Sequence, residues 1–212
     1  MEMRRHIKYI GKIAASLLLA LVILVNGEKT PALANDALAQ LQESVDAILE
    51  ILQSEELRTP ERKKERNQRV LDVVNKMFDF REMARSSLGP TWNTLTLEEQ
   101  ERFVELFKNL VEQRYIGKID SFDNQKVVYQ KQLIKGDKAM IYTDIVDKDL
   151  EVPIIYKLQE IEGKWLIYDM KIENVSLIVN YRRDFESIIR KEQFAGLITK
   201  ITEQLEKSET QN

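Results

Sequence analysis

The 212-residue sequence contains no cysteine and a single histidine, His6. Without cysteine the chain has no disulfide bond, no catalytic thiol, no zinc–thiolate site and no lipid anchor on an N-terminal cysteine. With one histidine it has no metal site built on two of them, and a Ser-His-Asp triad could use only His6. These absences exclude several common classes of enzyme and metalloprotein.

Glycine is also scarce, with seven residues, and no glycine-rich loop suited to cradling a phosphate group is present. The G-x-S-x-G motif of many hydrolases is missing as well. Aspartate and glutamate are abundant, so a carboxylate pair brought together only by folding stays open as an enzymatic alternative. The sequence therefore favours a protein that is not an enzyme and needs no cofactor.

Neither sign of charge dominates, since 32 lysines and arginines stand against 35 aspartates and glutamates, interspersed along the chain. Nucleic-acid-binding proteins usually carry a basic stripe or patch, so no nucleic-acid partner is expected. The length allows one domain that buries a sizeable core or encloses a cavity.

A long uncharged run occurs at the N-terminus, where basic residues up to Lys12 precede the 13 residues from Ile13 to Val25. This run has the length of a signal-peptide core and is shorter than the ~20 residues of a membrane span. Small residues at Ala32 and Ala34 suit a cleavage site. We expect residues 1–34 to be a cleaved signal peptide and residues 35–212 to be the exported domain, with an uncleaved anchor as the alternative.

The remaining chain shows helical periodicity first, then strand periodicity, then helical periodicity again. Short polar connections between the strands, such as Gly136-Asp137, indicate an antiparallel meander. The sequence predicts a single α+β domain with N-terminal helices, a four-stranded antiparallel sheet and C-terminal helices. The predicted helices are 36–57, one starting at Thr59-Pro60, 78–88, 97–118, 176–191 and 194–205, and the strands are 126–134, 138–146, 152–158 and 165–172.

The most specific stretch runs from Gly163 to Ile198 and reads GKWLIYDMKIENVSLIVNYRRDFESIIRKEQFAGLI. Asn174 ends a strand there, and Ser176 is a suitable N-cap for the helix that follows. Together with FDFREMARSSLGPTWNTLT, from Phe78 to Thr96, this stretch resembles the MlaC family, the periplasmic phospholipid-binding proteins of the Mla transport system, also called the toluene-tolerance family. Two positions depart from the family pattern, because Asn174 and Gln193 stand where glycine is usual.

The resemblance implies a soluble periplasmic carrier that holds the acyl chains of a phospholipid inside the protein. It also implies two docking partners, an inner-membrane Mla ABC transporter complex and an outer-membrane MlaA-type lipoprotein with a porin. Such a carrier shuttles lipid between the two membranes and maintains the lipid asymmetry of the outer membrane.

The predicted strands are apolar on both faces, as adjacent pairs such as Ile154-Ile155 and Leu166-Ile167 show. Helices on both faces, or a plain two-layer core, would explain this pattern, and so would an apolar cavity that holds a ligand. The resemblance favours the cavity, and the sequence does not determine which face of the sheet lines it. The residues that we place at the cavity are Met140, Tyr142, Val152, Ile154, Tyr156, Leu158, Leu166, Tyr168 and Met170.

Three polar features have competing interpretations. Arg182 follows Asn180-Tyr181 as in the family pattern, and it either binds a lipid phosphate at the rim of the cavity or forms a surface ion pair. Asp169, in the middle of an apolar strand, is interpreted as a structural hydrogen-bond acceptor. The charged stretch Glu61–Arg69 is either a solvated helix face or a docking surface.

Two other functions compete with the lipid carrier. One is an exported protein–protein interaction module with a filled core and no lipid. The other is a secreted hydrolase of lipid-like substrates, which would need a cluster of carboxylates or serines assembled by folding.

Overall fold

A computed structural model describes residues 36–116, 125–147 and 150–209. The predicted signal peptide lies outside these residues. In chain order the helices are α2 (Ala37–Gln53), α3 (Lys63–Met77), α4 (Phe80–Leu88), α5 (Leu97–Ile116) and α6 (Leu177–Glu209), with short 3-10 turns at Glu55–Arg58, Pro60–Arg62 and Gly89–Thr94. The strands are β1 (Lys126–Lys135), β2 (Lys138–Asp147), β3 (Leu150–Ile161), β4 (Lys164–Ile172) and β5 (Val175–Ser176).

The strands form one antiparallel sheet in the order β1-β2-β3-β4-β5, which confirms the predicted meander. The prediction of four strands was one short. Val175 and Ser176 turn back onto the end of β4 and pair with Ile172 and Lys171, which adds a two-residue strand. Left-handed backbone at Glu173 (φ 48°) and Asn174 (φ 65°) makes this reversal, as the predicted strand break at Asn174 requires.

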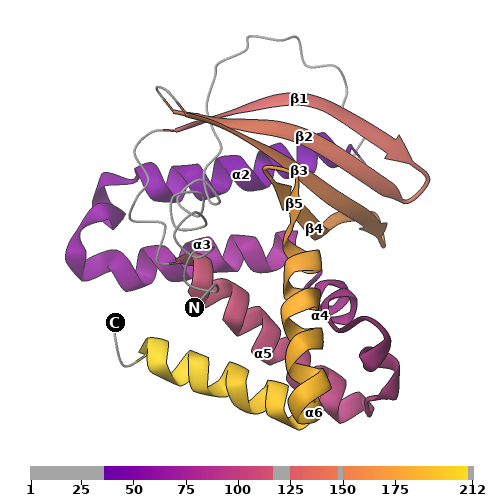
Figure 1. Cartoon of the computed structure of the whole chain (residues 1–212). Coiled ribbons are helices and arrows are strands. Elements are labelled where there is room, and N and C mark those ends of the chain that lie inside the picture. The colour runs from indigo at the N-terminus through magenta and orange to yellow at the C-terminus, as the bar shows by residue number, and fades with distance from the viewer. Residues whose placement is uncertain (1–35, 117–124, 148–149, 210–212) are drawn as a thin grey trace.

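The helices lie on one side of the sheet (Figure 1). Helices α2 and α3 run beneath the strands, while α4, α5 and α6 form a separate group farther from β1. The alternation of buried and exposed residues along β2 agrees with a sheet that is covered on one face. The sequence-based idea of helices on both faces is therefore wrong for the described residues.

Side-chain caps determine where several helices begin. The carboxylate of Asp36 caps α2, and that of Asp79 caps α4 at 2.8 Å from a backbone N–H of its first turn. At the start of α5, Thr96 and Glu99 form a capping box. The Thr96 N–H donates to the Glu99 carboxylate at 2.8 Å, and the Glu99 N–H donates back to the Thr96 hydroxyl at 3.2 Å.

Asp169 anchors the start of α6 to the sheet, which confirms its predicted structural role. The Ser176 hydroxyl donates to its carboxylate at 2.9 Å, and the Ile178 N–H donates to it at 3.3 Å. Lys157 on the neighbouring strand places its ammonium 2.9 Å from the same carboxylate. A buried carboxylate with these partners is satisfied, and it ties α6 to β4 and β3.

Helix α6 corresponds to the two predicted C-terminal helices, joined across a sharp bend at Gln193 (Figure 1). Gln193 has φ 62° and ψ −178°, a conformation that is almost confined to glycine. Three residues later, a Cβ on Gly196 would lie 2.3 Å from the Cβ of Glu192, so the bend also requires glycine at position 196.

Two hydrophobic clusters divide the interior. One joins the covered face of the sheet to α2 and α3, and the other joins α4, α5 and α6. Phe78 and Val74 pack against both clusters. The junction of the two clusters is where the fold leaves unfilled space.

Candidate functional site

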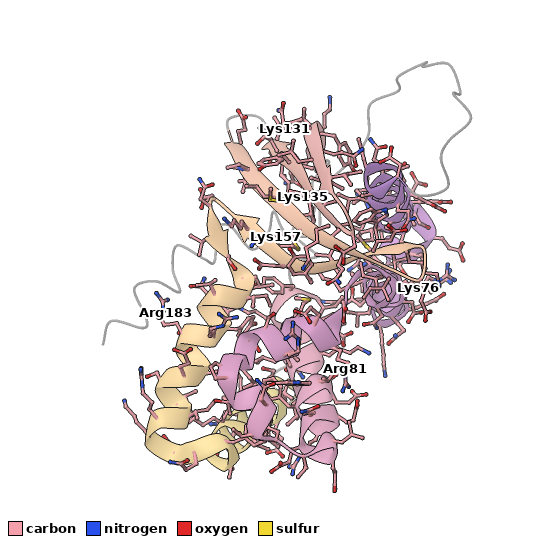
Figure 2. All side chains as sticks on the ribbon, turned by 90° about the vertical axis from the view of Figure 1, so that its right-hand side faces the viewer. Lys76, Arg81, Lys131, Lys135, Lys157 and Arg183 are labelled. Carbon is pink, nitrogen blue, oxygen red and sulfur yellow. The ribbon has the colours of Figure 1, made fainter. Side chains whose placement is uncertain are left out.

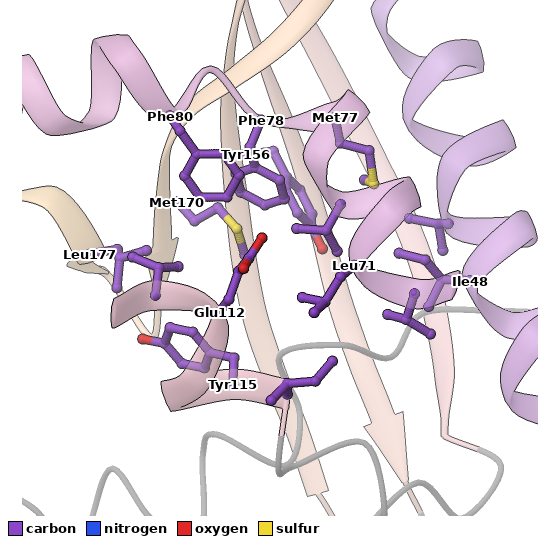
Figure 3. A pocket seen from close by; sticks show the side chains of 15 residues that line it. Ile48, Leu71, Met77, Phe78, Phe80, Glu112, Tyr115, Tyr156, Met170 and Leu177 are labelled. Carbon is purple, nitrogen blue, oxygen red and sulfur yellow. The ribbon is translucent and has the colours of Figure 1, made fainter. Parts of the chain in front are cut away.

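A pocket with about 780 Å³ of unoccupied space, its open mouth included, lies at the junction of the two clusters (Figure 3). Within it, the room for small molecules is about 80 Å³, so the pocket is a narrow slot in this structure. Its lining is apolar apart from one carboxyl and two hydroxyl groups. The lining residues are Val45, Ile48, Val70, Leu71, Val74, Met77, Phe78, Phe80, Val111, Glu112, Tyr115, Ile116, Tyr156, Met170 and Leu177.

Helices α2 to α6 and strands β3 and β4 all supply lining residues, because each presents apolar side chains to the junction. The helical periodicity of α2 brings Val45 and Ile48 to the same side, and the covered face of the sheet brings Tyr156 and Met170 next to each other across β3 and β4. Phe78 and Phe80 flank the start of α4, with ring centroids 5.8 Å apart. An apolar chain placed here would be surrounded by hydrocarbon.

The pocket opens between α3 and α5. Leu71 and Val74 on α3 are only half-buried, and so are Tyr115 and Ile116 on α5, whereas the lining residues of α2 and the sheet are buried. This gradient of burial gives the pocket an inner end at the sheet and a mouth at the two helices.

Two of the three polar groups in the lining are tyrosine hydroxyls. Burial raises the pKa of Tyr156 to about 12, and burial also raises the pKa of Tyr115. Both phenols are therefore neutral at physiological pH and offer hydrogen bonds rather than charge.

The third polar group is the carboxyl of Glu112 on α5. Burial raises its pKa above the usual value, while the charge of Lys108 and a hydrogen bond with Asn75 act in the opposite direction. Figure 3 shows its carboxyl group directed among the apolar side chains of the pocket. Glu112 was not predicted as a site residue, because a glutamate on an amphipathic helix has no distinctive sequence pattern.

Among the residues placed at the cavity from the sequence, Tyr156 and Met170 line the pocket. Val152, Ile154 and Leu158 lie on the same face of β3 and are buried in the adjacent core without reaching the pocket. Their burial agrees with an ordinary core role.

The sequence-based grouping of four further residues with the covered face of the sheet is wrong. These residues are Met140, Tyr142, Leu166 and Tyr168. On β2, Ile141 pairs with Tyr156, so Met140 and Tyr142 point to the uncovered face. On β4, a bulge leaves Tyr168 without a partner between Ile167 and Asp169. The extra residue shifts the alternation, so Met170 faces the pocket while Leu166 and Tyr168 face away.

The uncovered face combines lysines with aromatic rings. The ammonium of Lys131 lies 4.5 Å from the ring centroid of Tyr142, and that of Lys138 lies 4.8 Å from the ring centroid of Tyr168. Figure 2 shows Lys131, Lys135 and Lys157 along the strands of the sheet. These contacts explain how apolar residues on this face are partly covered without a second layer of helices.

Arg182 is engaged with the protein itself. Its Nε donates to the carbonyl oxygen of Ser86 at 2.8 Å, and Nη2 donates to the same oxygen. Its side chain also lies close to Gly89, which ends α4 with φ 57°. Arg182 thus caps the C-terminus of α4 from α6, an arrangement that neither sequence interpretation included, and it does not line the pocket.

The charged stretch Glu61–Arg69 forms the start of α3 and the turn before it. Glu65 lies 2.8 Å from Arg62 and 2.6 Å from Arg69, so much of its charge is paired along the helix. Arg66 is buried, unlike the exposed Lys63 and Lys64. These contacts agree with a solvated helix face, and its role in docking stays a prediction.

Within residues 36–116, 125–147 and 150–209, no group of three or more acidic or histidine side chains is arranged to hold a metal ion. None of the described helices combines the length and apolar character needed to cross a membrane.

Comparison with solved structures supports the fold. The phospholipid-binding protein from Ralstonia solanacearum, solved in complex with a phospholipid, superposes with a TM-score of 0.71 and 23% sequence identity, covering 82% of this chain and 98% of that one. At this level of identity the likeness concerns the fold alone.

Comparison of sequences identifies the family. The intermembrane phospholipid transport system binding protein MlaC of Haemophilus influenzae is 27% identical over 120 residues, which are 54% of this chain and 56% of that protein. The match thus spans about half the length of this curated relative. The family profile described as MlaC protein matches residues 42–203, most of the chain. On this match, the chain belongs to the MlaC family.

Proposed function

We propose that this protein is a phospholipid carrier that holds lipid acyl chains in the pocket between α3 and α5. The observation that carries this proposal is the apolar pocket itself, which is lined almost entirely by hydrocarbon and lies between the two hydrophobic clusters. The relative from Haemophilus influenzae is named for phospholipid transport, and the solved neighbour from Ralstonia solanacearum contains a phospholipid. Both support the same class of ligand.

The carrier proposal extends to location and partners through the family. Residues 35–212 would act in the periplasm after export. They would exchange lipid with an inner-membrane Mla ABC transporter complex and with an outer-membrane MlaA-type lipoprotein and its porin, and so maintain outer-membrane lipid asymmetry.

Physical chemistry explains why such a carrier needs docking partners. Each buried CH₂ group stabilises the bound lipid by about 0.8 kcal/mol, so release of a whole acyl chain into water is very slow. A partner that offers a continuous apolar path removes this barrier. A carrier therefore combines a closed apolar interior with a mouth that can meet another surface.

The decisive experiment is mass spectrometry of the purified protein, first in the folded state and then after solvent extraction. The carrier proposal predicts a phospholipid bound in stoichiometric amount. An empty protein that takes up no lipid from vesicles would favour an exported interaction module instead. Turnover of the offered lipid would favour the hydrolase.

A substitution at the mouth makes the test specific to this pocket. Val74→Trp adds a large ring at a half-buried lining position on α3, and we expect it to lower bound lipid about fivefold or more, since it occupies the space of an acyl chain. Val179→Trp is the matched control, because Val179 is exposed on α6 with 59% of its surface accessible. Equal lipid content in both variants and the wild type would place the lipid elsewhere.

A further inference from the structure

The carboxyl group of Glu112 is out of place in an apolar pocket. Only 14% of its side-chain surface is exposed, and its Oε1 accepts no hydrogen bond from the described residues. Figure 3 shows the group directed into the pocket, between residues of α3 and the sheet. Burying an acceptor without a donor costs free energy of folding, and a ligand that brings a donor into the pocket would recover this cost.

A second acceptor without a donor lies beside it. Asn75, on the facing helix α3, is hydrogen-bonded to the Glu112 carboxyl through its side chain, yet its Oδ1 is buried and accepts no hydrogen bond from the described residues. The lining residue Glu112 and its neighbour Asn75 therefore present two oxygen acceptors that lack donors among the described residues, and the Glu112 carboxyl carries negative charge when ionised.

One cation stands nearby without satisfying these acceptors. The ammonium of Lys108, one helical turn before Glu112, lies 3.9 Å from Oε1, which is beyond hydrogen-bonding distance. With 31% of its side chain exposed against 14% for Glu112, Lys108 is the more accessible member of the pair. A cation therefore stands beside the buried carboxyl group without donating a hydrogen bond to Oε1.

We propose that Glu112 and Asn75 select phospholipids whose headgroup ends in a primary ammonium, while Lys108 faces the phosphate of the same headgroup. A primary ammonium carries three N–H donors and a positive charge, which matches the two unsatisfied acceptors. The phosphate beside it supplies the negative partner for Lys108. This inference rests on the proposed function, because it assigns the headgroup preference of the proposed lipid pocket.

Other headgroups should bind less well at this site, for two reasons. A quaternary ammonium keeps the charge but has no N–H group to donate. A headgroup with net negative charge meets the Glu112 carboxylate in a poorly solvated position, where repulsion between like charges is strong. The expected order of binding is therefore phosphatidylethanolamine, then phosphatidylcholine, then phosphatidylglycerol.

The test measures which lipid is loaded from a defined mixture. Lipid-free protein is incubated with vesicles containing equal amounts of phosphatidylethanolamine, phosphatidylcholine and phosphatidylglycerol with identical acyl chains, and bound lipid is quantified by mass spectrometry. We expect wild-type protein to enrich phosphatidylethanolamine over phosphatidylglycerol about three- to tenfold, as one charge-assisted hydrogen bond at a half-open site implies.

The informative variant is Glu112→Gln, which keeps the size of the side chain and removes its charge. The enrichment of phosphatidylethanolamine over phosphatidylglycerol should be lost among the lipid that this variant binds. Glu98→Gln is the matched control, since Glu98 is an exposed residue of α5 that does not line the pocket. It should keep the wild-type enrichment.

A second measurement needs no variant. Wild-type protein is offered the series from phosphatidylethanolamine through its mono- and dimethylated forms to phosphatidylcholine, which removes N–H donors one at a time. Loading should fall along the series. Equal loading along the series, or an unchanged enrichment in Glu112→Gln, would overturn the headgroup inference while leaving the carrier intact. A wild-type protein that binds none of these lipids would overturn both.

Discussion

At the scale of single residues, Glu112 links pocket chemistry to stability. Burial raises its pKa in the folded protein above the value of about 4.5 that an exposed glutamate has. The folded state therefore binds a proton more tightly than the unfolded state, and stability is lost as pH rises from about 4.5 through the folded pKa. Charged neighbours on both packed helices, Lys108 and Glu105 on α5 and Asp72 on α3, are already part of this balance.

The corresponding prediction concerns the lipid-free protein. Glu112→Gln should gain free energy of unfolding relative to the wild type at pH 7.5, and this gain should shrink at pH 4, where the wild-type carboxyl is protonated in both states. Urea unfolding at the two pH values measures the difference. A gain that is the same at both values would mean that burial of the charge is not its cause.

Arg182 is the second residue with a defined energetic role. Because its guanidinium donates to the Ser86 carbonyl at the end of α4, Arg182→Ala should lower the free energy of unfolding by about 1.5–3 kcal/mol, the range for hydrogen bonds to charged groups. Arg183→Ala should change it by less than about 0.5 kcal/mol, since Arg183 is exposed.

Lipid content distinguishes this capping role from a phosphate-binding role. Under conditions where Arg182→Ala is fully folded, it should carry as much lipid as the wild type. A folded variant that has lost its lipid would instead support the phosphate-binding role of Arg182 that the family pattern suggested.

At the scale of elements, the bend inside α6 holds strain at Gln193. Its φ of 62° and ψ of −178° belong to a region that costs a residue with a side chain roughly 1–3 kcal/mol. Gln193→Gly should therefore stabilise the protein by about 1 kcal/mol after the greater chain entropy of glycine is subtracted.

The control for this prediction is Gln193→Ala, which shortens the side chain but keeps the Cβ that causes the strain. We expect its Tm to stay near that of the wild type, while Gln193→Gly raises it. If alanine and glycine raise the Tm equally, the long side chain and not the backbone conformation is responsible.

At the scale of the whole molecule, α3 is a candidate docking surface for the proposed carrier, because it borders the mouth of the pocket between the two hydrophobic clusters. Lys63 and Lys64 are exposed at its N-terminal end, whereas the buried Arg66 is unsuitable for charge reversal. If the proposed carrier docks here, reversing Lys63 and Lys64 to glutamate should slow lipid transfer to membranes that contain the proposed Mla transporter complex, without lowering bound lipid, because electrostatic steering acts on association.

Charge reversal at Arg190 and Lys191, exposed near the bend of α6, is the matched control and should leave the transfer rate unchanged. Transfer measured at two salt concentrations adds a second criterion, since a steering effect weakens as ionic strength rises. A Lys63/Lys64 variant that transfers lipid at the wild-type rate would remove this surface from consideration.

Local features were predictable from the sequence because their causes are local. The capping box at Thr96 and Glu99, the strand break at Asn174 and the cap at Ser176 depend on residues within one turn of each other. The short fifth strand was missed because two residues carry no periodicity. The helical faces that line the pocket belong to apolar stripes, and helical periodicity alone does not distinguish a pocket wall from ordinary core.

The amino-acid sequence by itself determined the order and type of the elements, the antiparallel meander and the family resemblance, since these depend on period, caps and turns. Only the tertiary structure decided which sheet face is covered, that a bulge at Tyr168 turns Met170 inward, and that Glu112 reaches the pocket. It also decided that Arg182 meets Ser86, 96 residues away along the chain. Such relations depend on register and on packing between distant segments, and a residue's own neighbours in sequence do not constrain either.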